Sequence, residues 1–316
     1  MKKSFTCIEI GVVLLGLALS GACRPRTKNS SALQSFTDAH AVAPHQLNGV
    51  PVVGEIALTS NRNVIGGLPV GGAAFDETST LIVSRPQFVV AFNTVAKVPR
   101  WTTWQIKESD IGDIERENQF QSDDILNKYL ELKNHEIGVT PSEYKHSCFD
   151  RGHQSPAKDR SNSQQDSRAT FYMSNMAPQT AFLNRGIWGK FEAYTRTLAQ
   201  AQHKRLQVIA GPILRDGREG IGSKGDIAVP DSFFKIVIVY ADGESQTPES
   251  YVAVIMPNVT ADGLDPLSNR AQNCKESKGA RSGSMASDWE TYQVTIADIQ
   301  TRTGMKFPAI AGVAKL

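Results

Sequence analysis

The stretch Cys148-Phe-Asp-Arg-Gly-His-Gln-Ser-Pro-Ala-Lys-Asp159 places a carboxylate, a guanidinium, a glycine and an imidazole in an unbroken row, Asp150 to His153. A second dense stretch follows it: Phe171-Tyr-Met-Ser-Asn-Met-Ala-Pro-Gln-Thr-Ala-Phe-Leu-Asn-Arg-Gly-Ile-Trp-Gly-Lys-Phe-Glu192. Polar side chains of several chemical types are interleaved there with large apolar ones. We interpret the two stretches as parts of one site, and the rest of the chain as its scaffold.

The bulk composition limits the classes of protein that the chain can belong to. A length of 316 residues suits one large domain or two small ones. The formal net charge is only +2, so any affinity for nucleic acid must come from local positive potential. The four cysteines include no Cys-x-x-Cys pair, which disfavours a thiolate zinc site.

The N-terminal residues have the order of an export signal. Lys2 and Lys3 precede the apolar run Ile10-Gly-Val-Val-Leu-Leu-Gly-Leu-Ala-Leu19, and Ser20-Gly-Ala22 supplies small residues for cleavage. The run is too short to span a bilayer comfortably. The alternative to an export signal is a buried strand or helix of the fold. We predict a signal peptide over residues 1–22 and an exported protein that is periplasmic, anchored to the outer membrane as a lipoprotein, or secreted.

Cys23 occupies the place of the lipidated cysteine of a bacterial lipoprotein. The lipoprotein pattern asks for leucine three places earlier, where this chain has Ser20, and Leu19 comes one residue too early. Lipidation and simple cleavage therefore both remain open. Residues 23–75 are rich in Ser, Asn, Pro and Gly, so we expect an extension or linker, to which Val50–Leu58 could add a strand.

From residue 80 onward, short apolar runs rich in β-formers alternate irregularly with helical patterns. Gly211-Pro212 is expected to stop one strand, Asp262–Ser287 is expected to be a polar loop, and Thr295 begins a capping-box pattern for a helix that Gly304 ends. The expected strands are Leu81–Val83, Phe88–Phe92, Trp101–Ile106, Thr170–Met173, Leu206–Ala210, Phe233–Tyr240 and Tyr251–Met256; the expected helices are Ile125–Ile137 and Thr180–Lys204. This mixture predicts an α+β fold with a mixed, mainly antiparallel sheet core flanked by helices.

The two stretches contain what hydrolysis of a phosphodiester requires: a base for water, positive charge at the phosphate, and help for the leaving oxygen. His153 is suited to the first task near neutral pH. Asn184 and Glu192 offer oxygen atoms for a hard cation such as Mg²⁺. In a helix, about 100° per residue would place these two side chains roughly 80° apart, on broadly the same side, with Arg196 one turn further on.

The chain resembles the DNA/RNA non-specific endonucleases, the ββα-metal or His-Me finger group that includes mitochondrial endonuclease G. The family's first signature stands here as Asp150-Arg-Gly-His153. Its second block stands as Ser174-Asn175, Pro178-Gln179, Asn184-Arg-Gly186-Ile-Trp188 and Glu192. Weaker similarities, among them Arg116 with Phe120, extend over most of the chain after Leu81. The resemblance implies an endonuclease domain over residues 76–316 that contains a ββα-metal motif.

This resemblance also implies roles for individual residues. His153 would be the general base and Asn184 the direct protein ligand of Mg²⁺, for which Mn²⁺ or another divalent cation can substitute. Glu192 would hold metal-bound waters, and Asn175 would support the site by hydrogen bonds. Arg116 would reach the scissile phosphate with assistance from Arg196, while Arg151 either binds phosphate or supports its loop.

Three functions remain open from the sequence. The first is an exported, Mg²⁺-dependent endonuclease that cuts DNA and RNA with little sequence preference and leaves 5′-phosphate ends, as the family does. The second is a catalytically silent module that binds nucleic acid, which the intact His153, Asn184 and Glu192 disfavour. The third is a nuclease toxin or effector, which would require an inhibitor partner. A homodimer also stays open as an assembly.

Two further expectations concern the surroundings of the site. Lys158, Arg160 and Arg168 lie between the two stretches, where they form either a phosphate-attracting rim or a solvated loop. Cys148 and Cys274 either pair in an oxidising compartment or stay separate, because sequence alone does not fix the distance between them.

Overall fold

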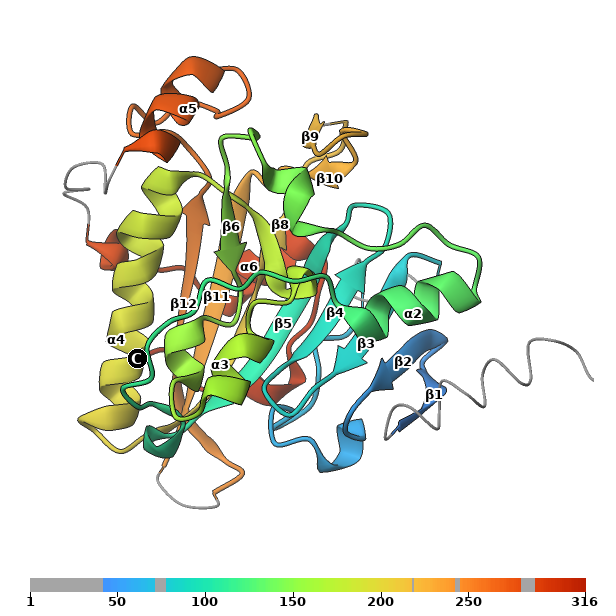
Figure 1. Cartoon of the computed structure of the whole chain (residues 1–316). Coiled ribbons are helices and arrows are strands. Elements are labelled where there is room, and N and C mark those ends of the chain that lie inside the picture. Colours follow the sequence, from blue (N-terminus) through green and yellow to red (C-terminus); the bar gives the residue numbers. More distant parts are fainter. Residues whose placement is uncertain (1–41, 72–77, 218, 242–244, 280–287) are drawn as a thin grey trace, which may run out of the picture.

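The computed structural model describes residues 42–71, 78–217, 219–241, 245–279 and 288–316. Its centre is an eight-stranded sheet in the order β1-β2-β3-β4-β5-β8-β11-β12 (Figure 1). Only the contact between β2 and β3 is parallel. The strands are β1 (Val42–Leu47), β2 (Val50–Gly54), β3 (Thr80–Ser84), β4 (Val89–Asn93), β5 (Val98–Ile106), β8 (Arg205–Ile213), β11 (Ser232–Tyr240) and β12 (Pro248–Pro257).

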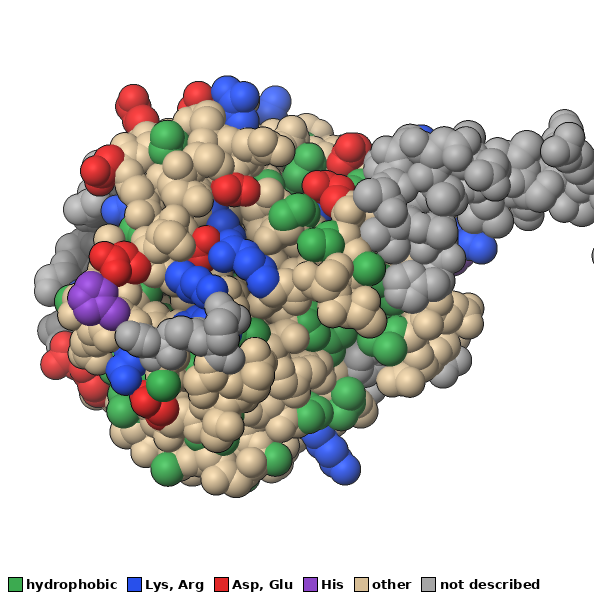
Figure 2. Space-filling view, turned by 90° about the horizontal axis from the view of Figure 1, so that it is seen from below, with side chains coloured by type: hydrophobic (Ala, Val, Ile, Leu, Met, Phe, Trp, Pro, Cys, Tyr) green, Lys and Arg blue, Asp and Glu red, His purple; other side chains and the backbone are tan. Residues whose placement is uncertain are grey.

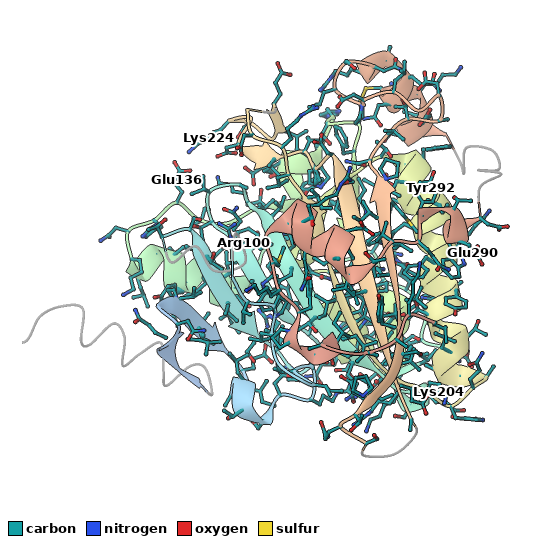
Figure 3. The ribbon with its side chains drawn as sticks, turned by 180° about the vertical axis from the view of Figure 1, so that it is seen from behind. Arg100, Glu136, Lys204, Lys224, Glu290 and Tyr292 are labelled. Carbon is teal, nitrogen blue, oxygen red and sulfur yellow. A yellow bond between two sulfur atoms is a disulfide. The ribbon has the colours of Figure 1, made fainter. Side chains whose placement is uncertain are left out.

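Both faces of this sheet are covered. Every residue of β11 is buried, because successive side chains of a strand point to opposite faces and each face has its own core. Val237 belongs to one apolar cluster, and its neighbours Ile236 and Ile238 belong to the other. The first face carries α2 (Asp124–Leu132), α3 (Gln164–Ala169) and α4 (Trp188–Gln200), whereas α6 (Ile296–Thr303) lies on the second (Figures 1 and 3).

The functional stretches form a small unit on the first face. β6 (Asp150–His153) pairs antiparallel with β7 (Met176–Gln179), and α4 follows β7 after one irregular turn. Met176 and Ala177 of β7 and Trp188 and Phe191 of α4 are all buried in the core of that face. The predicted α+β class, with a mainly antiparallel sheet and a ββα unit, is confirmed.

Several expected elements differ from the structure. The strand that Val50–Leu58 could add is found as β2, and Val42–Leu47, which we assigned to the extension, adds β1 beside it. Thr170–Met173 is not a strand: Tyr172 makes a single bridge to Gln121, and a 3₁₀ turn begins at Met173. β8 runs through Gly211-Pro212 instead of stopping there. Pro212 has no backbone N–H to donate, and it lies opposite Phe233 of β11. The expected polar loop contains α5 (Arg270–Lys278).

Other expectations are confirmed or lie outside the described residues. Thr295 caps α6 with a capping box to Asp298, and Gly304 ends it in the left-handed conformation with φ 68°. A disulfide joins Cys148 to Cys274. The predicted signal peptide and Cys23 precede residue 42, where the description begins. No helix in the described segments has both the length and the apolar character needed to cross a membrane.

Candidate active site

Asn175 fastens the segment after His153 to the segment before β7. Its amide Nδ2 donates to the carbonyl oxygens of Ser155 and Thr170 at 2.8 and 2.9 Å, and its Oδ1 accepts from the Ser155 backbone N–H at 3.0 Å. The side chain is fully buried, so each of these bonds forms away from water. Asn175 therefore fixes the backbone beside the imidazole, which agrees with the supporting position expected for it.

His153 lies in an aromatic pocket. Its ring centroid is 4.9 Å from that of Phe171, in an edge-on arrangement, and 5.7 Å from that of Phe120. The residue is buried, and within the described part of the chain its Nε2 has no hydrogen-bond partner. The lone pair of this nitrogen is therefore an acceptor that no described residue uses.

The pKa of His153 is held well below its ordinary value, chiefly because burial disfavours the charged imidazole. The positive charges of Arg116 and Arg151 lower the pKa further, and a hydrogen bond to the backbone of Arg151 opposes them in part. The imidazole is therefore neutral at physiological pH, which is the protonation state that a general base requires.

Gly152 makes room for Gln179. A Cβ atom at position 152 would lie 2.5 Å from Cγ of the Gln179 side chain and closer still to its amide group. The space next to Gly152 is filled by this buried glutamine of the neighbouring strand, so the position accepts no side chain without a shift.

We expect Gly152→Ala to destabilise the fold by about 1–3 kcal/mol, because the added methyl group overpacks a buried site. Gly189→Ala is the matched control, since a Cβ there would meet its nearest atom, the Asn184 carbonyl oxygen, at 3.6 Å. Urea unfolding of both variants measures the effect. Equal stability of Gly152→Ala and the wild type would show that Gln179 moves aside freely.

Asn184 is oriented by Asp150. Its Nδ2 donates to Oδ2 of Asp150 at 2.9 Å, which leaves the amide oxygen for another partner. Asn184 lies in a π-helical turn, Leu183–Ile187, in which Gly186 departs from helical geometry with φ −101° and ψ −111°. The long helix expected over residues 180–204 is thus interrupted at Gly186, and the ideal angular spacing between Asn184 and Glu192 does not apply. Such turns are frequent at functional sites.

Glu192 projects from α4 into a buried group of charges. Its Oε1 accepts from Nζ of Lys235 at 3.3 Å, and Lys235 lies 4.0 Å over the ring of Trp188. Burial raises the pKa of Glu192, and the positive charge of Lys235 counteracts this rise. Burial likewise lowers the pKa of Lys235. The lysine therefore helps to keep a partly buried carboxylate ionised.

Arg196 and Asp159 belong to the same group. Nη1 of Arg196 lies 3.1 Å from Oδ1 of Asp159, whose other oxygen accepts from the indole Nε1 of Trp104 at 3.0 Å. The expected helical relation of Arg196 to Glu192 is found, since both lie on α4. In this structure the guanidinium of Arg196 is bonded to the carboxylate of Asp159.

Arg116 connects the two halves of the site. Its guanidinium carbon lies 5.2 Å from the centroid of the Phe171 ring, beside His153. The surrounding protein lowers the pKa of Arg116 even though the residue is exposed, and the charges of Glu192 and Asp150 raise it. One arginine thus lies within electrostatic reach of the imidazole and of both carboxylates. The local acidity of Glu115 and Glu117 does not keep it from this position.

Arg151 contacts the aromatic pocket, whereas the residues of the candidate rim, Lys158, Arg160 and Arg168, have three different environments. The Arg151 guanidinium carbon stacks 4.1 Å over the Phe120 ring, so its contact supports the aromatic pocket of His153. Of the expected rim, Lys158 is exposed and Arg168 pairs with Glu117 at 2.8 Å. Arg160 is buried and bonded to the Gln87 carbonyl and to Asn63, so its assignment to a rim is wrong.

Sequence reasoning missed three residues that hold the site: Lys235, Asp159 and Arg185. Lys235 is a single charge within the apolar run Phe233–Tyr240, and that contrast was a readable signal of a buried ion pair. Asp159 ends the first stretch, but nothing in the sequence shows that it meets Trp104. Arg185 makes a two-pronged contact with Asp150, with distances of 2.8 and 2.6 Å.

The oxygen donors in the site suit a hard divalent cation. Among the described residues no group of three His, Cys, Asp or Glu side chains could enclose a metal ion. Mg²⁺ does not require such a cage, because it keeps several waters and binds one or two protein oxygens together with substrate phosphate. The free amide oxygen of Asn184 and the carboxylate of Glu192 fit this mode of binding.

Charges of both signs are mixed on the surface. Seen from below, Lys and Arg side chains gather near the middle of the face, and Asp and Glu side chains lie around them (Figure 2). This agrees with the small net charge of +2. Attraction of a polyanion must therefore come from local groups such as Arg116.

The fold and this donor set suit a metal-assisted hydrolase of phosphodiesters, and the comparisons with known proteins point to the same class. The model of the DNA/RNA non-specific endonuclease family matches residues 72–312. A nuclease of Nostoc sp. is 31% identical over 264 residues, 82% of this chain and 84% of the relative. Mitochondrial endonuclease G of Bos taurus is 30% identical over 247 residues, 73% of this chain and 78% of the relative.

A solved structure shares the fold. The structure of an EndoG/EndoGI complex, described as showing the mechanism of EndoG inhibition, matches with a TM-score of 0.56 and 22% identity over 77% of this chain and 89% of that one. The chain belongs to the DNA/RNA non-specific endonuclease family. It is thus a hydrolytic nuclease from a family that depends on metal, and its substrates are nucleic acids. The silent binding module is thereby disfavoured.

Proposed function

We propose that the protein is an exported, Mg²⁺-dependent endonuclease that hydrolyses both DNA and RNA, with His153 as general base and Asn184 as the metal ligand. The observation that carries this proposal is the pairing of a buried, neutral imidazole with an asparagine whose amide nitrogen is already bonded to Asp150. The imidazole is free to take a proton, and the amide oxygen is free to bind a cation.

His153 performs the proton transfer. Its unpartnered Nε2 accepts a proton from the attacking water, and Phe120 and Phe171 shield the ring so that it is neutral beforehand. Arg116 faces the same aromatic pocket, and its guanidinium fork matches phosphate oxygens. The hydroxide equivalent would attack phosphorus, and a 5′-phosphate would remain on one product strand.

Asn184 would bind the cation through Oδ1, and Glu192 would orient its waters without direct contact. A cation held there offsets charge on the phosphate and stabilises the departing oxygen. Asn175 holds the backbone next to the base, and Arg151 holds the aromatic wall. Arg196 contributes through Asp159, with which it shares the buried group of charges around Glu192.

Indifference to the sugar and to base sequence follows from what the site recognises. Its candidate contacts, Arg116 and a metal ion, are suited to phosphate, and phosphate contacts carry no direct sequence information. The family is named for DNA and RNA alike, and the relatives of this chain include a mitochondrial endonuclease G.

Export is proposed from the N-terminal sequence and from the disulfide. The Cys148–Cys274 bridge agrees with an oxidising compartment, because cytosolic proteins seldom keep structural disulfides. Lipidation at Cys23, a homodimer and a role as a toxin or effector are further proposals. The EndoG/EndoGI complex supplies a precedent for an inhibitor in a protein of the same fold. Metabolic labelling with a fatty acid, compared between the wild type and Cys23→Ala, tests the anchor.

A direct test incubates the purified protein with plasmid DNA and, separately, with single-stranded RNA across a series of divalent cations. We expect cleavage of both substrates with Mg²⁺ or Mn²⁺ and none after chelation. Asn184→Ala should need far more metal than the wild type, because it lacks the direct ligand. A wild type that is inert with every cation, or that cuts equally well in chelator, would contradict the proposal.

The pH dependence tests the state of the base. Because burial lowers the pKa of His153 from its ordinary 6.5, kcat/KM should persist as pH falls through 6.5 and decline only well below it. The same shift makes the folded protein bind fewer protons than the unfolded chain in this range, so stability should decrease as pH falls below 6.5.

Phe120→Ala gives the comparison for this profile. Removing the ring exposes His153 to water, which should move the acid limb of kcat/KM toward higher pH. A wild-type profile that already titrates at the ordinary histidine value would contradict the assignment of His153 as a shielded base.

A further inference from the structure

Helix α5 lacks the apolar stripe that normally attaches a helix to a protein. Its sequence, Arg-Ala-Gln-Asn-Cys-Lys-Glu-Ser-Lys from Arg270 to Lys278, is almost entirely polar, and its buried residues are Asn273 and Glu276. A helix this short is marginal in isolation and depends on tertiary contacts for its stability. Hydrophobic burial therefore contributes little to holding α5 in place.

A disulfide and a buried carboxylate help to attach this helix. The disulfide from Cys274 reaches Cys148, two residues before β6 begins. Glu276 accepts from the backbone N–H of Ala261 at 3.0 Å. The covalent bond thus ties α5 directly to the strand that carries His153.

The end of α5 meets Arg185. Nη1 of Arg185 donates to the carbonyl oxygen of Gly279 at 2.8 Å, and Nη2 donates to that of Ser277 at 3.1 Å. The same guanidinium binds both carboxylate oxygens of Asp150 at 2.6 and 2.8 Å. Arg185 therefore joins the C-terminal end of α5 to the first residue of β6.

Asp150 connects Arg185 to Asn184, the proposed metal ligand. Its Oδ2 accepts from Arg185 and also from the amide Nδ2 of Asn184. With the carboxylate fixed on both sides, the amide plane of Asn184 has one preferred setting, with Oδ1 turned away from Asp150. The order of contacts is disulfide, α5, Arg185, Asp150 and Asn184.

We propose that Arg185 is a positioning residue for the metal ligand Asn184, and that the Cys148–Cys274 disulfide keeps it in place by holding α5. The inference rests on the proposed role of Asn184. It adds a consequence: the nuclease binds its metal tightly only after the disulfide has formed, so its full activity is confined to oxidising compartments.

Only arginine suits this position. The contacts require at least four N–H groups in a planar fork that reaches one carboxylate and two carbonyl oxygens at once. Lysine would keep the charge, but it offers three donors from a single atom and cannot span both partners.

The first test measures Mg²⁺ and Mn²⁺ binding by calorimetry on the oxidised protein without substrate, with nuclease assays alongside. Groups that orient a metal ligand typically account for about 10–100-fold in metal affinity, so Arg185→Ala should weaken binding by that factor and Arg185→Lys by less. Arg302→Ala, an exposed arginine on α6, is the matched control and should bind metal as the wild type does.

The second test breaks the disulfide. Excess dithiothreitol supplies two electrons and two protons, gives free thiols at Cys148 and Cys274, and is itself oxidised to its cyclic disulfide. Metal affinity should fall as in Arg185→Ala. The Cys148→Ser/Cys274→Ser variant should behave likewise, and adding Arg185→Ala to it should cause little further loss, because the changes act through one series of contacts.

The outcomes separate this inference from the proposed function. Unchanged metal affinity in Arg185→Ala, or losses that simply add when the disulfide is also removed, would overturn the inference while the wild type still cuts. If Arg185→Ala does not fold, Arg185→Lys and the reduced wild type decide by the same criterion. A wild type that binds no divalent cation would overturn the proposed function and the inference with it.

Discussion

His153→Ala should lower kcat/KM on plasmid DNA by about 10²–10⁴-fold, the usual contribution of a positioned general base. The variant removes a group whose unpartnered Nε2 and low pKa suit it to activate water. Metal binding should be kept, because the proposed ligand Asn184 is untouched. The measurement is initial rates of cleavage with saturating Mg²⁺, with calorimetry to confirm metal binding.

His135→Ala provides the matched control for this result. His135 is an exposed histidine after α2 and lies outside the described contacts of the site, so its loss should leave the rate unchanged. If His153→Ala cuts as fast as His135→Ala, then another group activates the water. If His153→Ala instead loses metal binding, then the imidazole is a ligand and not a base.

Lys235→Met should cause the largest loss of stability, about 3–5 kcal/mol, as expected when one partner of a buried ion pair is removed. Glu192 would lose its Lys235 contact, and its pKa would rise further because the opposing positive charge is gone. The carboxylate would then ionise only at higher pH. The acid limb of the activity profile should move upward together with the loss of stability in urea unfolding.

Lys204→Met is the comparison, since Lys204 follows the end of α4 and pairs with Glu249 at the protein surface (Figure 3). Surface pairs of this kind contribute about 0–1 kcal/mol. A Lys235→Met protein as stable as Lys204→Met, with an unchanged pH profile, would show that Glu192 does not depend on Lys235.

The sequence was most informative where a local pattern has one physical solution. The apolar runs at Phe88–Phe92 and Phe233–Tyr240 became buried strands, because few other arrangements cover both of their faces. The capping-box pattern at Thr295 formed as expected. Asp150–His153 and Asn184–Glu192 were recognisable as one site because their side-chain types together match a single chemistry.

The errors lie where long-range contacts outweigh local signals. Gly211-Pro212 looks like a strand end, but pairing with Phe233 and Phe234 of β11 keeps β8 extended there, one residue beyond its last pair with β5. The polar sequence of α5 looks like a loop, because its attachment comes from Cys274 and not from an apolar face. Val42–Leu47 joins the sheet by pairing with β2, which composition does not reveal.

Within the site, the residues proposed to contact substrate or metal were easier to predict from the sequence than the residues that hold them in place. Asp159, Lys235 and Arg185 act through partners that are distant in the chain: Trp104, Glu192 and the end of α5. Their pairing depends on how β5, β11 and α5 assemble around α4. No single-sequence pattern encodes such distances, so the supporting contacts became visible only in three dimensions.

A crystal structure of the protein with Mn²⁺, in which anomalous scattering locates the metal, would show directly which residue binds the cation. We expect a metal bonded to Oδ1 of Asn184, with Glu192 reaching it through water and His153 Nε2 outside the coordination sphere. A metal bonded to His153, or one that binds without contact to Asn184, would contradict the assignment of Asn184 as ligand and His153 as base.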